Sequence, residues 1–148
     1  MLKLSKKIEY GILAVQYMAS KPDDLVRAKE ISEKMNLSFD FLAKTLQTLN
    51  KNGLISSQQG VHGGYKLSKN VSDMTLTDVI MSLEEKTSIV DCMAPGETDC
   101  NRSEGCSLKH PIHLLQQKID KLFDSITISE LVNAQNKVNL ELEYKKTN

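Results

Sequence analysis

Apolar residues recur at helical spacing near the start of the chain. Between residues 6 and 20 they repeat every three or four positions, which predicts an amphipathic helix with Ser5 as its N-cap. Pro22 and two aspartates predict a turn after it, and a second short helix is expected over residues 28–35. Residues 25–26 between them can form a short extended piece.

A third helix is predicted between residues 38 and 52. Ser38 can cap the free N–H groups at its start, and Asp40 lies where the helix dipole favours a negative charge. Gly53 supplies a left-handed stop. One side of this helix is apolar, and the polar side is predicted to present Phe39, Lys44, Gln47, Thr48 and Lys51.

Two short strands, LISSQQ and GYKLSK, follow directly and are joined by the tip GVHGG. Its glycines, Gly60, Gly63 and Gly64, permit backbone angles closed to other residues, so we predict a β-hairpin. After the hairpin, Thr75 and Asp78 resemble a capping box that begins a further helix.

The C-terminal part of the chain also has helical spacing. Pro111 suits the first turn of a helix whose apolar residues repeat over about four turns, and such a stripe must be covered by another surface. Thr127 and Glu130 can cap a last short helix. The polar segment from about residue 135 is predicted to be a mobile tail.

A short helix, a turn, a capped helix with a polar face and a glycine-tipped hairpin form the order of a winged helix-turn-helix. We therefore predict a mainly α fold with a small β-hairpin wing. In such folds the second helix of the motif enters the major groove, while basic residues elsewhere hold phosphates. The competing interpretation is that the same residues are only solvated surface. The candidate DNA-contacting residues are Arg27, Lys29, Ser38, Phe39, Lys44, Thr45, Gln47, Thr48, His62, Gly63 and Lys66.

Composition and charge agree with this reading. The chain has 148 residues, of which 40% are hydrophobic and 26% charged, as expected of a cytoplasmic globular protein with no membrane segment. Its net charge is zero, but residues 1–70 carry 11 Lys and Arg against 6 Asp and Glu, whereas residues 71–148 carry 8 against 13. The basic first half is the part expected to meet a polyanion.

All three cysteines, Cys92, Cys100 and Cys106, lie in one polar segment. An odd number of cysteines without a secretory signal argues against a disulfide framework and leaves metal binding, redox sensing or spare thiols. Their spacing matches neither a zinc ribbon nor a plant-type ferredoxin. Thiolates are soft ligands suited to iron–sulfur clusters, and a loop containing proline and glycine can wrap around one.

Taken in order, these motifs resemble the Rrf-two family of bacterial transcription regulators. The resemblance covers about residues 1–133 and implies a homodimer that reads palindromic double-stranded DNA, with the long helix from Pro111 as the dimer contact. It also implies that an iron–sulfur cluster controls operator affinity, although the family includes cysteine-metabolism repressors that lack one. The motifs that carry it are Lys6, Tyr10, EISEKMNLSFDFLAKTLQTLNKNGLI, the GxxGGYxL wing, TLTDVI, the cysteine loop and ITISELV.

This resemblance also implies a division of the chain and a set of ligands. Residues 1–85 would bind DNA, 86–110 would form the cluster loop, 111–134 would contain the dimerisation and terminal helices, and 135–148 would be the tail. The three cysteines match the cluster-ligating cysteines of the iron–sulfur members, for a 2Fe–2S or a 4Fe–4S cluster.

The fourth ligand departs from part of the family. Cluster-assembly regulators carry a histidine three residues after the last cysteine, where this chain has Lys109, with His110 following. Nitric-oxide-sensing members use an aspartate on the first helix of the other subunit, and the corresponding residue is Glu9. Glu9 is therefore the first candidate and His110 the alternative.

Two other functions remain open. The cysteines can act as a cluster-free thiol switch, or the chain can be a small metal or electron-transfer protein. We find no second carboxylate–histidine constellation, nucleophile motif or phosphate loop, so an enzyme is not expected. The signal, whether cluster status, nitric oxide or redox stress, is left undecided by the residues.

Overall fold

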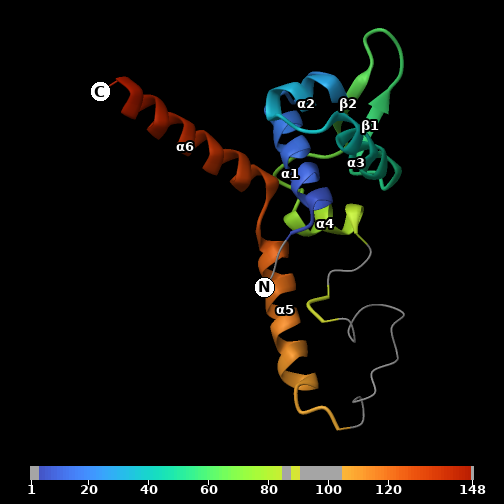
Figure 1. The fold of residues 1–148 in the computed structure, drawn as a ribbon, viewed down its shortest axis with the longest axis vertical. Helices are drawn as coiled ribbons and strands as arrows, with labels where there is room; N and C mark the ends of the chain where they lie inside the picture. Colours follow the sequence, from blue (N-terminus) through green and yellow to red (C-terminus); the bar gives the residue numbers. More distant parts are fainter. Residues whose placement is uncertain (1–3, 85–87, 91–104, 148) are drawn as a thin grey trace.

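The computed structural model describes residues 4–84, 88–90 and 105–147 (Figure 1). Cys92 and Cys100 lie outside the described residues. The elements in chain order are α1 (Lys6–Ala19), α2 (Ala28–Met35), α3 (Phe39–Lys51), β1 (Ile55–Gln58), β2 (Gly64–Leu67), α4 (Leu76–Leu83), α5 (Lys109–Ser125) and α6 (Ile128–Thr147).

The helix-turn-helix consists of α2 and α3. Asn36 ends α2 in the left-handed region, at φ 52°, which turns the chain sharply toward α3. Ser38 occupies the predicted N-cap of α3, but its side chain makes no capping hydrogen bond. Gly53 follows α3 at φ 76°, and this confirms the predicted stop.

The hairpin forms as predicted. Strands β1 and β2 are antiparallel, with Ile55 opposite Leu67. Val26, before α2, adds an isolated bridge to the outer side of β2. Its N–H donates to the Tyr65 carbonyl at 2.9 Å, and its carbonyl accepts from the Tyr65 N–H at 2.8 Å. The wing is therefore joined to the start of the helix-turn-helix.

Only one of the three hairpin glycines has a left-handed backbone. Gly60 has φ 114°, whereas Gly63 and Gly64 are needed because the backbone passes close to them. A Cβ at Gly63 would lie 2.2 Å from the Gln58 oxygen, and a Cβ at Gly64 would lie 2.8 Å from the Val26 oxygen. The predicted freedom of the backbone is therefore used at Gly60, whereas Gly63 and Gly64 are needed for their small size.

One hydrophobic core joins α1, α3, the hairpin, α4 and the start of α6. Its buried side chains come from the inner faces of these elements, and α1 and α4 approach closely at Gly11, where a Cβ would lie 2.3 Å from Leu83 Cδ1. The wing and α3 are therefore mounted on a packed base. Members of this core are Ala14, Val15, Met18, Leu42, Leu46, Leu49, Met74, Val79, Leu83 and Ile128.

Both predicted capping boxes are present. Thr75 and Asp78 exchange hydrogen bonds at the start of α4, and Thr127 and Glu130 do so before α6. The expectation of a short last helix followed by a tail is wrong, because α6 remains helical through Thr147. In Figure 1, α5 and α6 extend away from the core in different directions.

Candidate nucleic-acid interface and cysteine-bearing segment

The outward face of α3 carries the predicted contacts. Phe39 is 49% exposed, and Lys44 and Gln47 are also exposed, whereas Leu42 and Leu46 are buried on the opposite side. Thr48, half-buried, donates its hydroxyl to the Lys44 carbonyl at 3.0 Å. This face presents aromatic, cationic and carboxamide groups, which are chemical types that contact base edges and phosphates.

Thr45 does not belong to this face. Its side chain is 1% exposed, and its hydroxyl donates to the Phe41 carbonyl at 2.9 Å one turn earlier in the helix. The hydrogen bond satisfies the hydroxyl inside the core. The prediction that Thr45 contacts DNA is therefore wrong.

Tyr10 on α1 positions the start of α3, a role that we did not predict. Its hydroxyl accepts a hydrogen bond of 3.2 Å from the Ser38 N–H, and its ring packs edge-on against Phe41 with centroids 4.9 Å apart. The Ser38 N–H is one of the donors that a helix start leaves unpaired. The available signal was a tyrosine at a core-facing position of α1.

The wing tip is tied to α2 through Arg27. Its guanidinium donates to the Val61 carbonyl, and Val61 itself is 83% exposed. Arginine has five N–H donors, so others stay available to a phosphate. His62 and Lys66 are exposed on the same hairpin and Gly63 is partly buried. The structure thus brings Arg27 together with the wing residues.

Lys29 is exposed on α2 and forms a long, solvent-exposed ion pair with Glu33, at 3.9 Å. Such an exposed ion pair contributes little to the stability of the fold, so Lys29 can exchange it for a contact with a phosphate. By contrast, Lys21 binds the Glu30 carboxylate at 2.5 Å, and Tyr17 also donates to it at 2.8 Å. The Lys21 hydrogen bond, and then that of Tyr17, lower the pKa of Glu30. This group ties α1 to α2.

The candidate metal ligands are only partly described. Cys106 is a free, half-buried cysteine just before α5, and His110 is exposed in the first turn of that helix. The side chain of Glu9 is 48% exposed and pairs with Lys6 at 3.0 Å, and this hydrogen bond raises the pKa of Lys6. Within the described ranges, no three or more His, Cys, Asp and Glu side chains form a metal site.

Gln116 is a second residue that sequence reasoning missed. It is 8% exposed on α5, and its side-chain oxygen accepts a hydrogen bond of 2.8 Å from the N–H of Ile89. Residues 88–90 precede the three cysteines, and α5 follows them. This contact therefore joins the two sides of residues 92–106, which we call the cysteine-bearing segment. The available signal was the helical spacing of Gln116, four residues after Ile112 and three before Ile119.

Among the helices that the structure describes, none combines the length and apolar character needed to cross a bilayer.

Comparison with family models finds a match over residues 4–134 to Rrf2, described as an iron-dependent transcriptional regulator. This is the family that the motifs predicted.

Individual relatives agree. The chain is 32% identical to the HTH-type transcriptional regulator IscR of Photorhabdus laumondii, over 90% of this chain and 81% of that protein. It is 30% identical to the HTH-type transcriptional regulator NsrR of Oceanobacillus iheyensis, over 88% and 90%. Among solved structures, CymR, the global cysteine regulator of B. subtilis, superposes with a TM-score of 0.72 at 27% identity, covering 90% of this chain and 98% of that one.

Proposed function

The chain belongs to the Rrf2 family of winged-helix, DNA-binding transcriptional regulators, and we propose that an iron–sulfur cluster held by Cys92, Cys100 and Cys106 controls its affinity for operator DNA. Its relatives are transcriptional regulators and not enzymes. The observation that carries the proposal is that all three cysteines fall in one segment between α4 and the start of α5. We place the protein in the cytoplasm, where bacterial DNA lies.

The donor set fits such a cluster. Thiolates are the usual ligands of iron–sulfur clusters, and Cys106 is free and half-buried, so its sulfur is available. We assign the fourth position to Glu9 of the partner subunit, with His110 as the alternative. Glu9 is exposed and forms a surface ion pair with Lys6, which costs little to break. A carboxylate is a harder ligand than a thiolate and would leave one iron more open to exchange.

For DNA, we propose that α3 enters the major groove while the wing and the start of α2 hold the backbone. Ser38, Phe39, Lys44, Gln47 and Thr48 lie on or beside the outward face of α3. Arg27, linked to the wing tip, keeps the hairpin at a set position relative to the helix-turn-helix. The supporting phosphate contacts would come from Arg27, Lys29, His62, Gly63 and Lys66.

The protein is proposed to act as a dimer joined through α5. Leu115 and Leu122, at 46% and 56% exposure, lie seven residues apart, as do Leu108 and Leu115. A seven-residue spacing returns to nearly the same face of a helix, which is typical of helix–helix seams. Large exposed leucines in such a row indicate a covered surface, and a twofold dimer would match a palindromic operator.

A cluster-free thiol switch is the second candidate. The similarity to CymR favours it, since that protein is described as a global cysteine regulator. The chemistry would then be oxidation of one cysteine thiolate by a peroxide, which gives a sulfenic acid while the peroxide O–O bond is broken. A second cysteine thiol would condense with the sulfenic acid to form a disulfide and release water. The two candidates share the DNA-binding unit and differ only in what the cysteines hold.

The decisive experiment is anaerobic purification followed by absorption spectroscopy and by iron and sulfide analysis. A cluster gives brown protein with visible absorption and iron and sulfide in similar amounts. Operator binding is then measured at one stated salt concentration with the cluster present and after its removal, because phosphate contacts make affinity steeply salt-dependent. Protein that stays colourless after anaerobic reconstitution contradicts the cluster, and a change in DNA affinity on mild oxidation would then support the thiol switch.

A further inference from the structure

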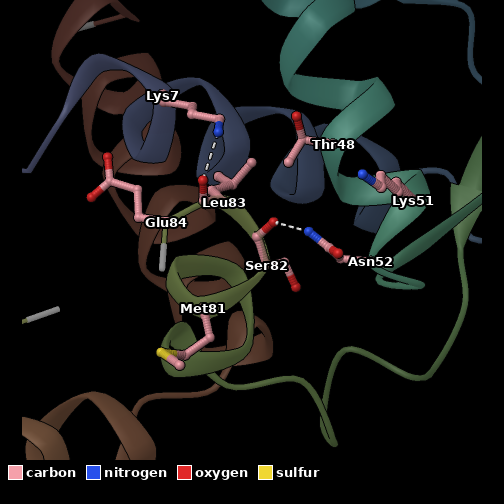
Figure 2. A pocket seen from close by; sticks show the side chains of 8 residues that line it. All are labelled: Lys7, Thr48, Lys51, Asn52, Met81, Ser82, Leu83 and Glu84. Atoms are coloured by element: carbon pink, nitrogen blue, oxygen red, sulfur yellow. Dashed lines mark hydrogen bonds between the residues drawn. The ribbon is translucent and has the colours of Figure 1, made fainter. Parts of the chain in front are cut away.

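The last turn of α4 is a meeting point of three helices. A cavity of about 610 Å³ opens there (Figure 2), lined by Lys7 of α1, by residues at the end of α3 and by residues 81–84. From Glu84 the chain continues toward Cys92. The end of the recognition helix and the first helix therefore both border the point at which the cysteine-bearing segment begins.

The carbonyl groups at this end of α4 are bound by side chains from the other two helices. A helix leaves its last four carbonyls without partners inside the helix. Here Asn52 Nδ2 donates to the Ser82 oxygen at 2.7 Å, and Lys7 Nζ donates to the Leu83 oxygen at 2.6 Å (Figure 2). A lysine at this position also interacts favourably with the negative end of the helix dipole.

Asn52 belongs to two helix ends at once. Its backbone is the C-cap of α3, with its N–H donating to the Thr48 carbonyl at 3.1 Å, while its side chain caps α4. A displacement of Ser82 would thus act directly on the end of the recognition helix. The Leu83 side chain packs against Gly11, which lies one helical turn after Lys7 on α1.

We propose that Asn52 and Lys7 are positioning residues that couple the state of the cysteine-bearing segment to the orientation of α3. This inference rests on the proposed function, since it requires a cysteine state that changes DNA affinity. A movement of the chain after Glu84 would displace the last turn of α4. The hydrogen bond from Asn52 to Ser82 would transmit this displacement to α3, while the hydrogen bond from Lys7 to Leu83 holds α4 against α1. The cavity leaves space beside Met81 and Ser82 of that turn, while Leu83 is packed in the core.

The test is the ratio of operator dissociation constants between the cluster-bound and cluster-free protein, at one salt concentration. Allosteric ratios are typically about 5 to 150, and one net hydrogen bond changes an equilibrium by a factor of about 2 to 12. Asn52→Asp keeps the shape of the side chain but places an oxygen where the donor was, and Asn52→Ala removes the donor without adding charge. Lys7→Met keeps the aliphatic stem and removes the ammonium.

We expect all three variants to bring the ratio closer to one, by about twofold or more, with iron content equal to wild type. Lys51→Met is the matched control, because Lys51 lines the same cavity yet, among the described residues, forms no hydrogen bond with α4. It can weaken DNA binding in both states, but the ratio should stay at the wild-type value. Circular dichroism and thermal melting confirm that each variant is folded.

Each remaining outcome decides between the two proposals. Folded variants with a wild-type ratio overturn the coupling role of Asn52 and Lys7 and leave the proposed function standing. Variants that lose iron also overturn the coupling role, because their effect would then come from loss of the cluster and not from the hydrogen bonds to α4. If the wild-type protein has equal affinity in both states, the proposed cluster control fails, and the coupling role fails with it. If the Asn52 variants do not fold, Lys7→Met decides by the same measurement.

Discussion

The side-chain oxygen of Gln116 accepts a hydrogen bond, 2.8 Å long, from the backbone N–H of Ile89. The amide nitrogen of Gln116 donates in turn to Asp120 at 2.7 Å. Among the described residues of α5, Gln116 is the buried one. Because Ile89 precedes Cys92, the pair holds the chain that leads to the first cysteine against the proposed dimer helix.

Replacing Gln116 by leucine should loosen this attachment. The change leaves the Ile89 N–H without its acceptor, and we expect the free energy of unfolding to fall by about 1–2 kcal/mol. Amide hydrogen exchange over residues 88–90 should become faster. Gln117→Leu is the control, because Gln117 is exposed, and it should alter stability by no more than about 0.5 kcal/mol. Equal exchange rates in the two variants would count against the attachment.

Lys44→Ala should weaken operator binding without changing iron content. If Lys44 neutralises one phosphate, its loss lowers affinity about equally for all sequences and reduces the slope of log affinity against log salt by about one. Gln47→Ala should act differently and lose about 1–3 kcal/mol of discrimination at one base pair. Titrations of operator and scrambled DNA at several salt concentrations separate the two effects. Lys118→Ala, on α5, is the control, and an effect as large there would contradict a role for the α3 face.

The double change Leu115→Glu and Leu122→Glu should produce monomers. Both side chains are exposed on one face of α5, and two buried carboxylates would oppose a helix–helix seam. Analytical ultracentrifugation measures the mass, and binding to a palindromic operator should fall far more than binding to a half-site. Gln117→Glu adds a like charge on the opposite side of the helix and should remain dimeric. A dimeric double variant would mean that another surface joins the subunits.

Local features were readable from sequence because their causes are local. The capping box of Thr75 and Asp78, the left-handed stop at Gly53 and the hairpin each depend on a few neighbouring residues. The polar segment after residue 135 misled us, because asparagine, lysine and glutamate there lack an apolar stripe yet are compatible with a helix, and α6 runs through it.

The rest could not be read locally. Thr45 lies at the edge of the buried stripe, and only the hydrogen bond to Phe41 shows how its hydroxyl is accommodated in the core. The contacts of Arg27 with Val61 and of Asn52 with Ser82 join positions 34 and 30 residues apart. Such pairs follow from the packing of the helices, which periodicity does not encode.

Stability should depend on pH through Asp78. Burial acts to raise the pKa of this carboxyl, but hydrogen bonds from Lys69 and from the Thr75 N–H outweigh it, and its pKa lies below the usual 3.8. A carboxyl whose pKa is lower in the folded protein than in the unfolded chain stabilises the fold at pH values above its unfolded-state pKa. This stabilisation is lost as the pH falls through its folded-state pKa.

The difference in unfolding free energy between wild type and Asp78→Asn should therefore be present at pH 7 and shrink below about pH 4. Urea denaturation at pH 7, 5 and 3 measures it. Asp73→Asn, in the preceding turn, is the control, since the Asp73 carboxylate forms no hydrogen bond or ion pair with the described residues. A difference that stays constant with pH would show that the charge of Asp78 contributes nothing.

The fourth cluster ligand can be identified by mixing subunits. If Glu9 of one subunit completes the site of the other, Glu9→Gln should make the cluster lose its visible absorption faster in the presence of a chelator, while His110→Ala should not. A mixed dimer of one Glu9→Gln chain and one Cys100→Ala chain would then contain one intact site, formed by the cysteines of the first chain and Glu9 of the second. One of the two cluster sites in this mixed dimer should therefore hold its cluster as stably as the wild-type protein does. If Glu9 instead completes the site of its own chain, the mixed dimer has no wild-type site, and a fast-losing His110→Ala variant would move the assignment to His110.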